Sequence, residues 1–230
     1  MTLTLAVFWI IVISLFAICG SYYARRYNRP DGLIALYVTV IVISNIVASK
    51  TIEYNLGFTT LFASAATIMF SVTFLLTDIV NERFGKKETQ RMILIALFSQ
   101  IILIVFSYLV VKATPAPFFT NQLAFESIFG LVPRIVIASF IAFYISENLD
   151  AQLFHWFKRL TNGKHLWMRN VFSSLPSMFV DSTIFVLIAF WGIMPIVPLI
   201  IGLTVIKWLV GIVDIPFMYL SRAVLGRDAI

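Results

Sequence analysis

The chain is poor in the residues that build most catalytic and metal sites. Its 230 residues include one cysteine, two histidines and 11 acids. The lone Cys19 provides neither a disulfide framework nor the spacing of a metal site. His155 and His165 flank a basic segment, where an interfacial position explains them better than metal binding. The sequence also has no Gly-x-Ser-x-Gly elbow, no His-Glu-x-x-His pair and no ATP-binding motif. We therefore predict no enzymatic activity, no cofactor and no metal.

Charged residues are also scarce, at 12% of the chain, whereas 60% of the residues are hydrophobic and 22 are phenylalanine. This composition excludes a soluble domain of this length. Apolar runs of about 20 residues cross a bilayer as helices. Seven such runs are present: Leu3–Tyr23, Gly32–Ser49, Thr60–Val80, Thr89–Val111, Leu131–Phe157, Val171–Trp191 and Pro195–Ser221. The sequence therefore predicts an all-α integral membrane protein with about seven transmembrane helices.

The basic residues are distributed unevenly around these spans. Thirteen lysines and arginines lie on one side: Arg25, Arg26, Arg29, Arg83, Lys86, Lys87, Arg91, Lys158, Arg159, Lys164, Arg169, Arg222 and Arg227. The other side carries only Lys50 and Lys112. Because cytoplasmic loops collect lysine and arginine, we predict an N-terminus outside the cell and a cytoplasmic C-terminus. The net charge of +6 thus marks orientation in the cell membrane and not a nucleic-acid surface.

Three ionisable residues lie deep inside the last two apolar runs. At the helical rise per residue, Asp181 lies about 15 Å from the start of its span and Lys207 about 18 Å from the start of the next. An ionisable side chain at mid-bilayer costs roughly 3 kcal/mol or more unless it is paired, so their similar depth predicts an ion pair. Asp214 follows seven residues after Lys207 on the same helical face. From the residues alone, a structural ion pair and a binding site for a polar cargo both remain open.

A second group of polar residues lies nearer the ends of the spans. It consists of Lys50, Asp78, Glu82, Arg134, Glu147 and Asp150. Salt bridges at the interface explain the four acids as well as a gate does, so we assign this group gating or structural roles. Asn45, late in the second span, is either a hydrogen-bond link between helices or a contact to cargo.

These residues carry a resemblance to the vitamin uptake transporter family, also called the queuosine precursor transporters. Several segments that match it follow in order, across about residues 33 to 221. They are Ser44–Lys50, Phe74–Asp78, Glu82–Gly85, Arg134 with Ala138–Phe140, Trp167 with Ser173–Ser174, Asp181–Ser182, Ile184–Phe185, Ala189–Phe190, and Lys207 with Asp214, Pro216 and Tyr219. Each motif is weak by itself, but their common order is specific.

The resemblance implies a six-helix core over residues 32–230, similar to the substrate-binding subunits of energy-coupling-factor transporters but working without their ATPase. Residues 1–31 are then an extra N-terminal helix and basic loop. The implied cargo is 7-cyano- or 7-aminomethyl-7-deazaguanine, a precursor of queuosine or archaeosine, carried by the chain alone or as a homo-oligomer. We expect it to be bound by Asn45, Asp181, Lys207 and Asp214. A carboxylate accepts the amino and ring N–H groups of a guanine edge, and Lys207 or Asn45 serves its carbonyl.

One position departs from the family pattern. Many relatives have glutamine or asparagine three residues before the aspartate that matches Asp181, whereas this chain has Met178. If that amide reads the base, the cargo of this chain differs. Two other functions stay open: a subunit that binds another vitamin or nucleobase and needs an ATPase coupling module, and a membrane scaffold whose buried charges are only structural.

Overall fold

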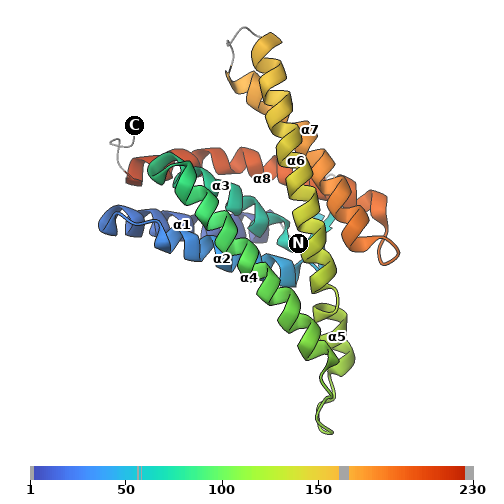
Figure 1. Cartoon of the computed structure of the whole chain (residues 1–230). Helices are drawn as coiled ribbons and strands as arrows, with labels where there is room; N and C mark the ends of the chain where they lie inside the picture. Colours follow the sequence, from blue (N-terminus) through green and yellow to red (C-terminus); the bar gives the residue numbers. More distant parts are fainter. Residues whose placement is uncertain (1–2, 56, 58, 161–165, 226–230) are drawn as a thin grey trace.

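The described residues fold into seven long helices, one short helix and a two-stranded hairpin (Figure 1). The computed structural model describes residues 3–55, 57, 59–160 and 166–225. The helices are α1 (Leu3–Tyr27), α2 (Asp31–Val47), α3 (Ala66–Phe84), α4 (Lys86–Lys112), α5 (Gln122–Phe129), α6 (Val132–Leu160), α7 (Leu166–Phe190) and α8 (Ile196–Leu225). The strands are β1 (Thr51–Asn55) and β2 (Thr60–Ser64). Each of the seven apolar runs corresponds to one long helix, so the mostly helical architecture is as predicted.

The start of the third predicted span is wrong, because Thr60–Ser64 is a strand. It pairs antiparallel with β1, in a register that places Thr51 opposite Ser64 and Asn55 opposite Thr60. Threonine and aromatic residues favour extended backbone, and the turn between the strands is closed by Gly57, whose φ is +90°. The Gly57 N–H donates a hydrogen bond to the Asn55 side chain. The short strand adjoins a helical run directly, so its apolar residues resemble a helix start in the sequence.

The helices form two groups that meet at the centre of the molecule. α6 packs closely against α7, and this pair crosses the group formed by α1, α2, α3 and α8 (Figure 1). α4 contacts both α2 and α6 and so links the two groups. A single residue, Gly85 with φ of +82°, joins α3 to α4. The buried core is apolar and rich in valine, leucine, isoleucine and alanine, and its alanines let neighbouring helices approach closely.

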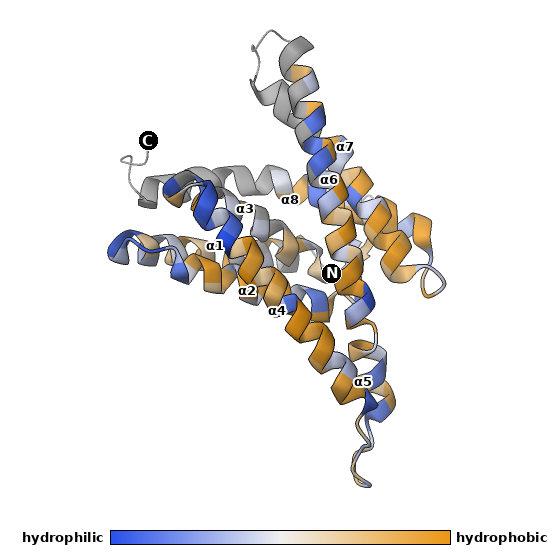
Figure 2. Cartoon of the chain, in the orientation of Figure 1, coloured by the Kyte–Doolittle hydropathy of each residue, from blue (hydrophilic) through white to orange (hydrophobic). Residues whose placement is uncertain are grey.

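Two stretches of the described residues have the length and composition of membrane spans. The stretches Lys86–Lys112 and Gln122–Asp150 are long and apolar enough to cross a membrane, and four shorter apolar helices accompany them. Figure 2 shows the hydrophobic residues along the middle of α4 and α6, with hydrophilic residues at the end where α4 begins. Only 17% of the apolar window of α4 is buried inside the protein. An apolar surface exposed on that scale is what lipid covers, so these helices indicate a membrane protein.

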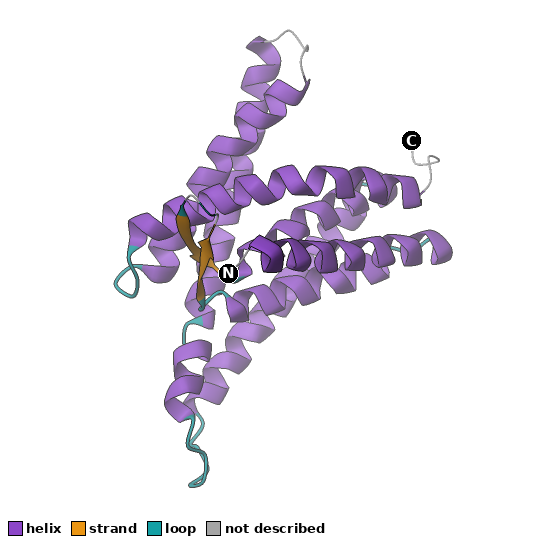
Figure 3. Cartoon of the chain, turned by 180° about the vertical axis from the view of Figure 1, so that it is seen from behind, coloured by secondary structure: helices purple, strands orange, loops and turns teal. Residues whose placement is uncertain are grey.

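The hairpin packs against α8 near the turn that follows α7 (Figure 3). A Cβ atom on Gly202 of α8 would lie 1.8 Å from the carbonyl oxygen of Phe62, so only glycine allows this approach. The Thr51 hydroxyl lies 3.1 Å from the sulfur of Met194. Tyr54 is buried in the hairpin, and burial raises the pKa of its phenol to about 12, so the group stays neutral at physiological pH. The hairpin is thus fixed where its last residue, Ser64, reaches the centre of the molecule.

Candidate functional site

A cavity lies where the two helix groups meet. Its enclosed volume is about 40 Å³, and the wider space between its lining residues is open to the exterior. Its walls come from α2, the hairpin, α3, α6, α7 and α8. The lining residues are Ser44, Asn45, Ala48, Ser64, Ala66, Thr67, Phe70, Ser139, Ala142, Asp181, Phe185, Leu203 and Lys207. Three of the four residues predicted to bind cargo, which are separated by up to 162 positions in the sequence (45 to 207), therefore line one space.

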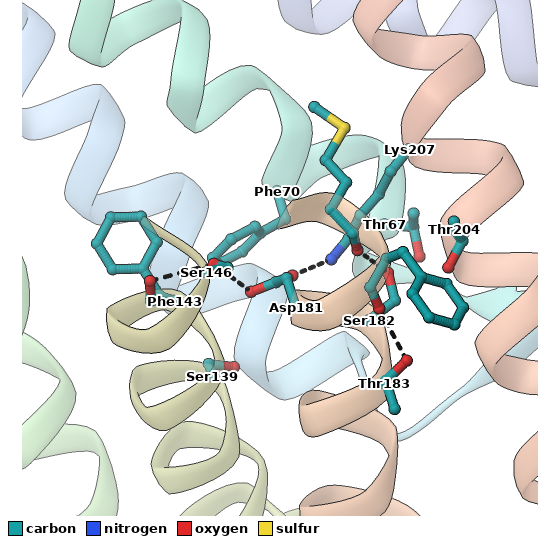
Figure 4. A network of polar contacts seen from close by, with 12 residues as sticks. Thr67, Phe70, Ser139, Phe143, Ser146, Asp181, Ser182, Thr183, Thr204 and Lys207 are labelled. Carbon is teal, nitrogen blue, oxygen red and sulfur yellow. Dashed lines mark hydrogen bonds and ion pairs between the residues drawn. The ribbon is translucent and has the colours of Figure 1, made fainter. Parts of the chain in front are cut away.

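The predicted ion pair between Asp181 and Lys207 is present at the wall of this cavity (Figure 4). Lys207 Nζ donates to Asp181 Oδ2, and the Lys207 and Asp181 side chains are only 11% and 17% exposed. The other carboxylate oxygen, Oδ1, lies 3.2 Å from the hydroxyl of Ser146. In this environment each charge offsets the cost of burying the other. The pair gives the cavity one strong acceptor and one strong donor side by side.

Asn45 belongs to a network of uncharged groups on the α2 side of the cavity. Its Nδ2 donates to the carbonyl of Ile41 at 3.2 Å and to Gln100 Oε1 at 2.8 Å. Its Oδ1 lies 3.2 Å from the hydroxyl of Ser139. Because both amide hydrogens are used inside the protein, Asn45 has only its oxygen left for a ligand. The expectation that Asn45 donates to a cargo carbonyl therefore does not fit this geometry.

The cavity also contains aromatic walls that a flat ring would need. Phe70 of α3 and Phe185 of α7 both line it. Phe185 is held by an edge-to-face contact with Phe190, with ring centroids 5.7 Å apart. Aromatic faces of this kind stack on planar ligands. The space is narrow, and the ion pair forms part of its wall.

The other predicted polar residues that the structure describes do not line the cavity. Arg134 donates from Nε to the carbonyl of Ile188 at 2.6 Å and from Nη2 to that of Trp191 at 2.8 Å, so it caps the end of α7. Asp150 accepts a hydrogen bond from Ser177 at 3.0 Å, which links α6 to α7. The Lys50 side chain is exposed at the start of the hairpin. Four side chains lie outside the described part of the structure: Asp78, Glu82, Glu147 and Asp214.

Sequence reasoning missed several groups that hold the site together. Gln100, Ser139 and Ser146 were not predicted, although each contacts a predicted residue. Serines are common in apolar helices and give little signal. Gln100 is different, because an amide near the middle of a long apolar run is costly to bury without a partner. That cost was a signal in the sequence. Among the described residues, no cluster of three or more histidine, cysteine or acidic side chains is placed to hold a metal ion.

Met178, the departure from the family pattern, does not line the cavity among the described residues. Its methyl carbon would lie 3.9 Å from a Cβ added at Gly211, so the side chain points towards α8. Its carbonyl accepts a hydrogen bond from Ser182.

The chain is similar to known membrane transporters over most of its length. The sequence model of a family described as "Putative vitamin uptake transporter" matches residues 64–221. A "Probable queuosine precursor transporter" from Bacillus subtilis (strain 168) is 28% identical over 228 residues, which is 96% of each chain. The "Queuosine precursor transporter" of Escherichia coli (strain K12) is 29% identical over 168 residues, covering 73% of this chain and 71% of that one. No solved structure matches the chain.

Proposed function

The chain belongs to the vitamin uptake transporter family, and on that premise we propose that it imports a 7-deazaguanine precursor of queuosine or archaeosine. The proposed cargo is 7-cyano- or 7-aminomethyl-7-deazaguanine. The observation that carries the proposal is the cavity that Asn45, Asp181 and Lys207 line together. The functions named for its relatives supply the cargo class. The family is one of transporters, so the chain is not an enzyme.

The chemistry of the cavity supports a flat cargo with hydrogen-bonding edges. A guanine-type ring carries an amino group and a ring N–H on one edge and a carbonyl next to them. The carboxylate of Asp181 is suited to accept from the N–H groups, and the ammonium of Lys207 to donate to the carbonyl. Phe70 and Phe185 are placed to stack on the ring. Asp214 is included in the proposed site, one to two turns further along α8.

We place the N-terminus outside the cell and the C-terminus in the cytoplasm. Most basic residues lie on one side of the predicted spans, and in membrane proteins that side is the cytoplasmic one. In this orientation α1 is an additional helix beside a six-helix core. The core is proposed to resemble the substrate-binding subunits of energy-coupling-factor transporters. Lys50, Arg134 and the acids nearer the helix ends are then framework or gate, not cargo contacts.

The proposal is tested in cells that cannot synthesise the precursor. Such cells are given 7-cyano-7-deazaguanine at low concentration, with and without this chain, and queuosine in tRNA is measured. We expect the chain to restore queuosine, and we expect Asp181→Asn to abolish the rescue. Ser21→Ala is a matched control, since Ser21 is a buried serine of α1 bonded to Ala17 and outside the cavity lining.

Failure of rescue, with the protein present in the membrane, would refute the proposed cargo. Purification of the chain together with an ATPase and a coupling membrane protein would instead favour a binding subunit. A scaffold would neither bind nor carry the precursor.

A further inference from the structure

Two polar groups at the α2 side of the cavity are available to a ligand, one because it has no partner among the described residues and one because its partner can release it. One is the hydroxyl of Ser44, which is 1% exposed, lines the cavity and has no hydrogen-bond partner among the described residues. Other serines and threonines of these helices donate to a carbonyl of their own helix, as Ser182 does to Met178 and Thr204 does to Ile200. Ser44 instead faces the empty space with its hydroxyl unbonded.

The second group is Oδ1 of Asn45, whose orientation is fixed from behind. The Ile41 carbonyl can only accept, so the atom of Asn45 that lies 3.2 Å from it must be the amide nitrogen. Gln100 then has to present Oε1 to that nitrogen, which leaves Gln100 Nε2 buried without a partner among the described residues. The protein thus accepts the cost of a buried unbonded N–H in order to hold the Asn45 amide in one orientation.

The neighbour of Asn45 Oδ1 is able to release it. The hydroxyl of Ser139 lies 3.2 Å from this oxygen and 2.9 Å from the carbonyl of Ile135. One hydroxyl has one hydrogen, so it serves one of these acceptors at a time. When a ligand N–H approaches Asn45 Oδ1, Ser139 keeps its bond to Ile135 and loses nothing.

We propose that Ser44 and Asn45 form a neutral edge of the site that reads an N–H donor of the cargo, and that Gln100 is its positioning residue. Asn45 Oδ1 accepts the N–H, and the Ser44 hydroxyl bonds the next polar atom along the ring. This deepens the proposed function and rests on it. Asp181 and Lys207 form the charged side of the cavity. The neutral edge rejects rings whose N–H is methylated or missing, because the Asn45 oxygen would then lose its partner.

The test measures the dissociation constants of the purified full-length protein for 7-cyano-7-deazaguanine and for analogues in which one N–H at a time is methylated or removed. We expect Ser44→Ala to bind the parent compound about tenfold more weakly, the loss of one ordinary hydrogen bond. We expect one analogue to lose about tenfold or more on the wild type but little on Gln100→Leu, in which the Asn45 amide is no longer held in register. Gln100→Glu keeps an oxygen for Asn45 Nδ2 and should retain the discrimination.

Stability separates this role from a purely structural one. Gln100→Leu removes one buried unbonded N–H group but leaves one hydrogen of Asn45 Nδ2 without an acceptor, so its melting temperature should stay near that of the wild type while its selectivity falls. Ser21→Ala should bind every probe as the wild type does. Unchanged affinity in Ser44→Ala together with unchanged discrimination in Gln100→Leu would overturn the inference and leave the proposed function standing. A wild type that binds none of the probes would overturn both.

Discussion

At the residue scale, the ion pair sets the energetics of the cavity. Asp181 and Lys207 satisfy one another, so the proposed cargo would replace part of their contact with bonds of its own. Removing one partner leaves an uncompensated buried charge, which costs several kcal/mol in typical proteins, about 3 to 5. Replacing both with well-packed apolar residues of similar volume is often neutral. A variant of Asp181 or Lys207 alone can therefore lose transport because it unfolds. A variant in which both are replaced keeps its stability and so isolates the loss of binding.

A second residue-scale prediction concerns Arg134. Its two hydrogen bonds to the carbonyls of Ile188 and Trp191 satisfy the end of α7, where helix carbonyls lack partners. We expect Arg134→Met to lower the free energy of unfolding by about 2 to 3 kcal/mol, since bonds to charged donors are the stronger kind. The free energy of unfolding of Arg134→Lys should lie between those of Arg134→Met and the wild type, because an ammonium lacks the planar fork of donors that a guanidinium has.

Thermal unfolding of the purified protein measures this effect, and cargo affinity is the control. If Arg134 is framework, the dissociation constant stays unchanged below the melting temperature. A variant with normal stability but altered transport would show that Arg134 acts as a gate.

At the scale of elements, the contact between the hairpin and α8 depends on one glycine. The approach of the Phe62 carbonyl to Gly202 leaves no space for a methyl group. We expect Gly202→Ala to push β2 away from α8. Overpacking should lower the free energy of unfolding by about 1 to 3 kcal/mol, and the melting temperature with it. Cargo binding should also weaken, because Ser64 lines the cavity.

Gly211→Ala is the matched control on the same helix. There the nearest atom to a new Cβ is the flexible end of Met178 at 3.9 Å, so alanine should be tolerated and should favour the helix. Equal melting temperatures for Gly202→Ala and Gly211→Ala would contradict the close packing of hairpin and helix.

The sequence predicted the elements unevenly, for physical reasons. Long apolar runs identify helices because the bilayer requires about 20 such residues. The pairing of Asp181 with Lys207 was predictable because burial is costly and the helical rise fixes depth. The hairpin was not, since Thr60–Ser64 is short and continuous with the helical run. The hydrogen bond between Asn45 and Gln100 was not predictable either, because it joins uncharged residues 55 positions apart and no repeating pattern in the sequence indicates it.

At the scale of the whole molecule, the apolar exterior and the polar centre have different roles. The exposed faces of α4 and α6 suit lipid, and the polar groups converge between the two helix groups. Because both groups contribute walls, a movement of one group against the other could open the cavity to either side of the membrane. Such a movement needs no second protein, so transport by this chain alone is the central claim.

The most direct test is uptake of labelled 7-cyano-7-deazaguanine by liposomes that contain only the purified chain. The account predicts that label accumulates inside, that unlabelled compound competes with it, and that Ser21→Ala behaves as the wild type. The double variant Asp181→Leu, Lys207→Met should melt near the wild-type temperature yet carry at least about tenfold less label. No uptake by wild-type protein that is folded and inserted in the liposomes would contradict the claim.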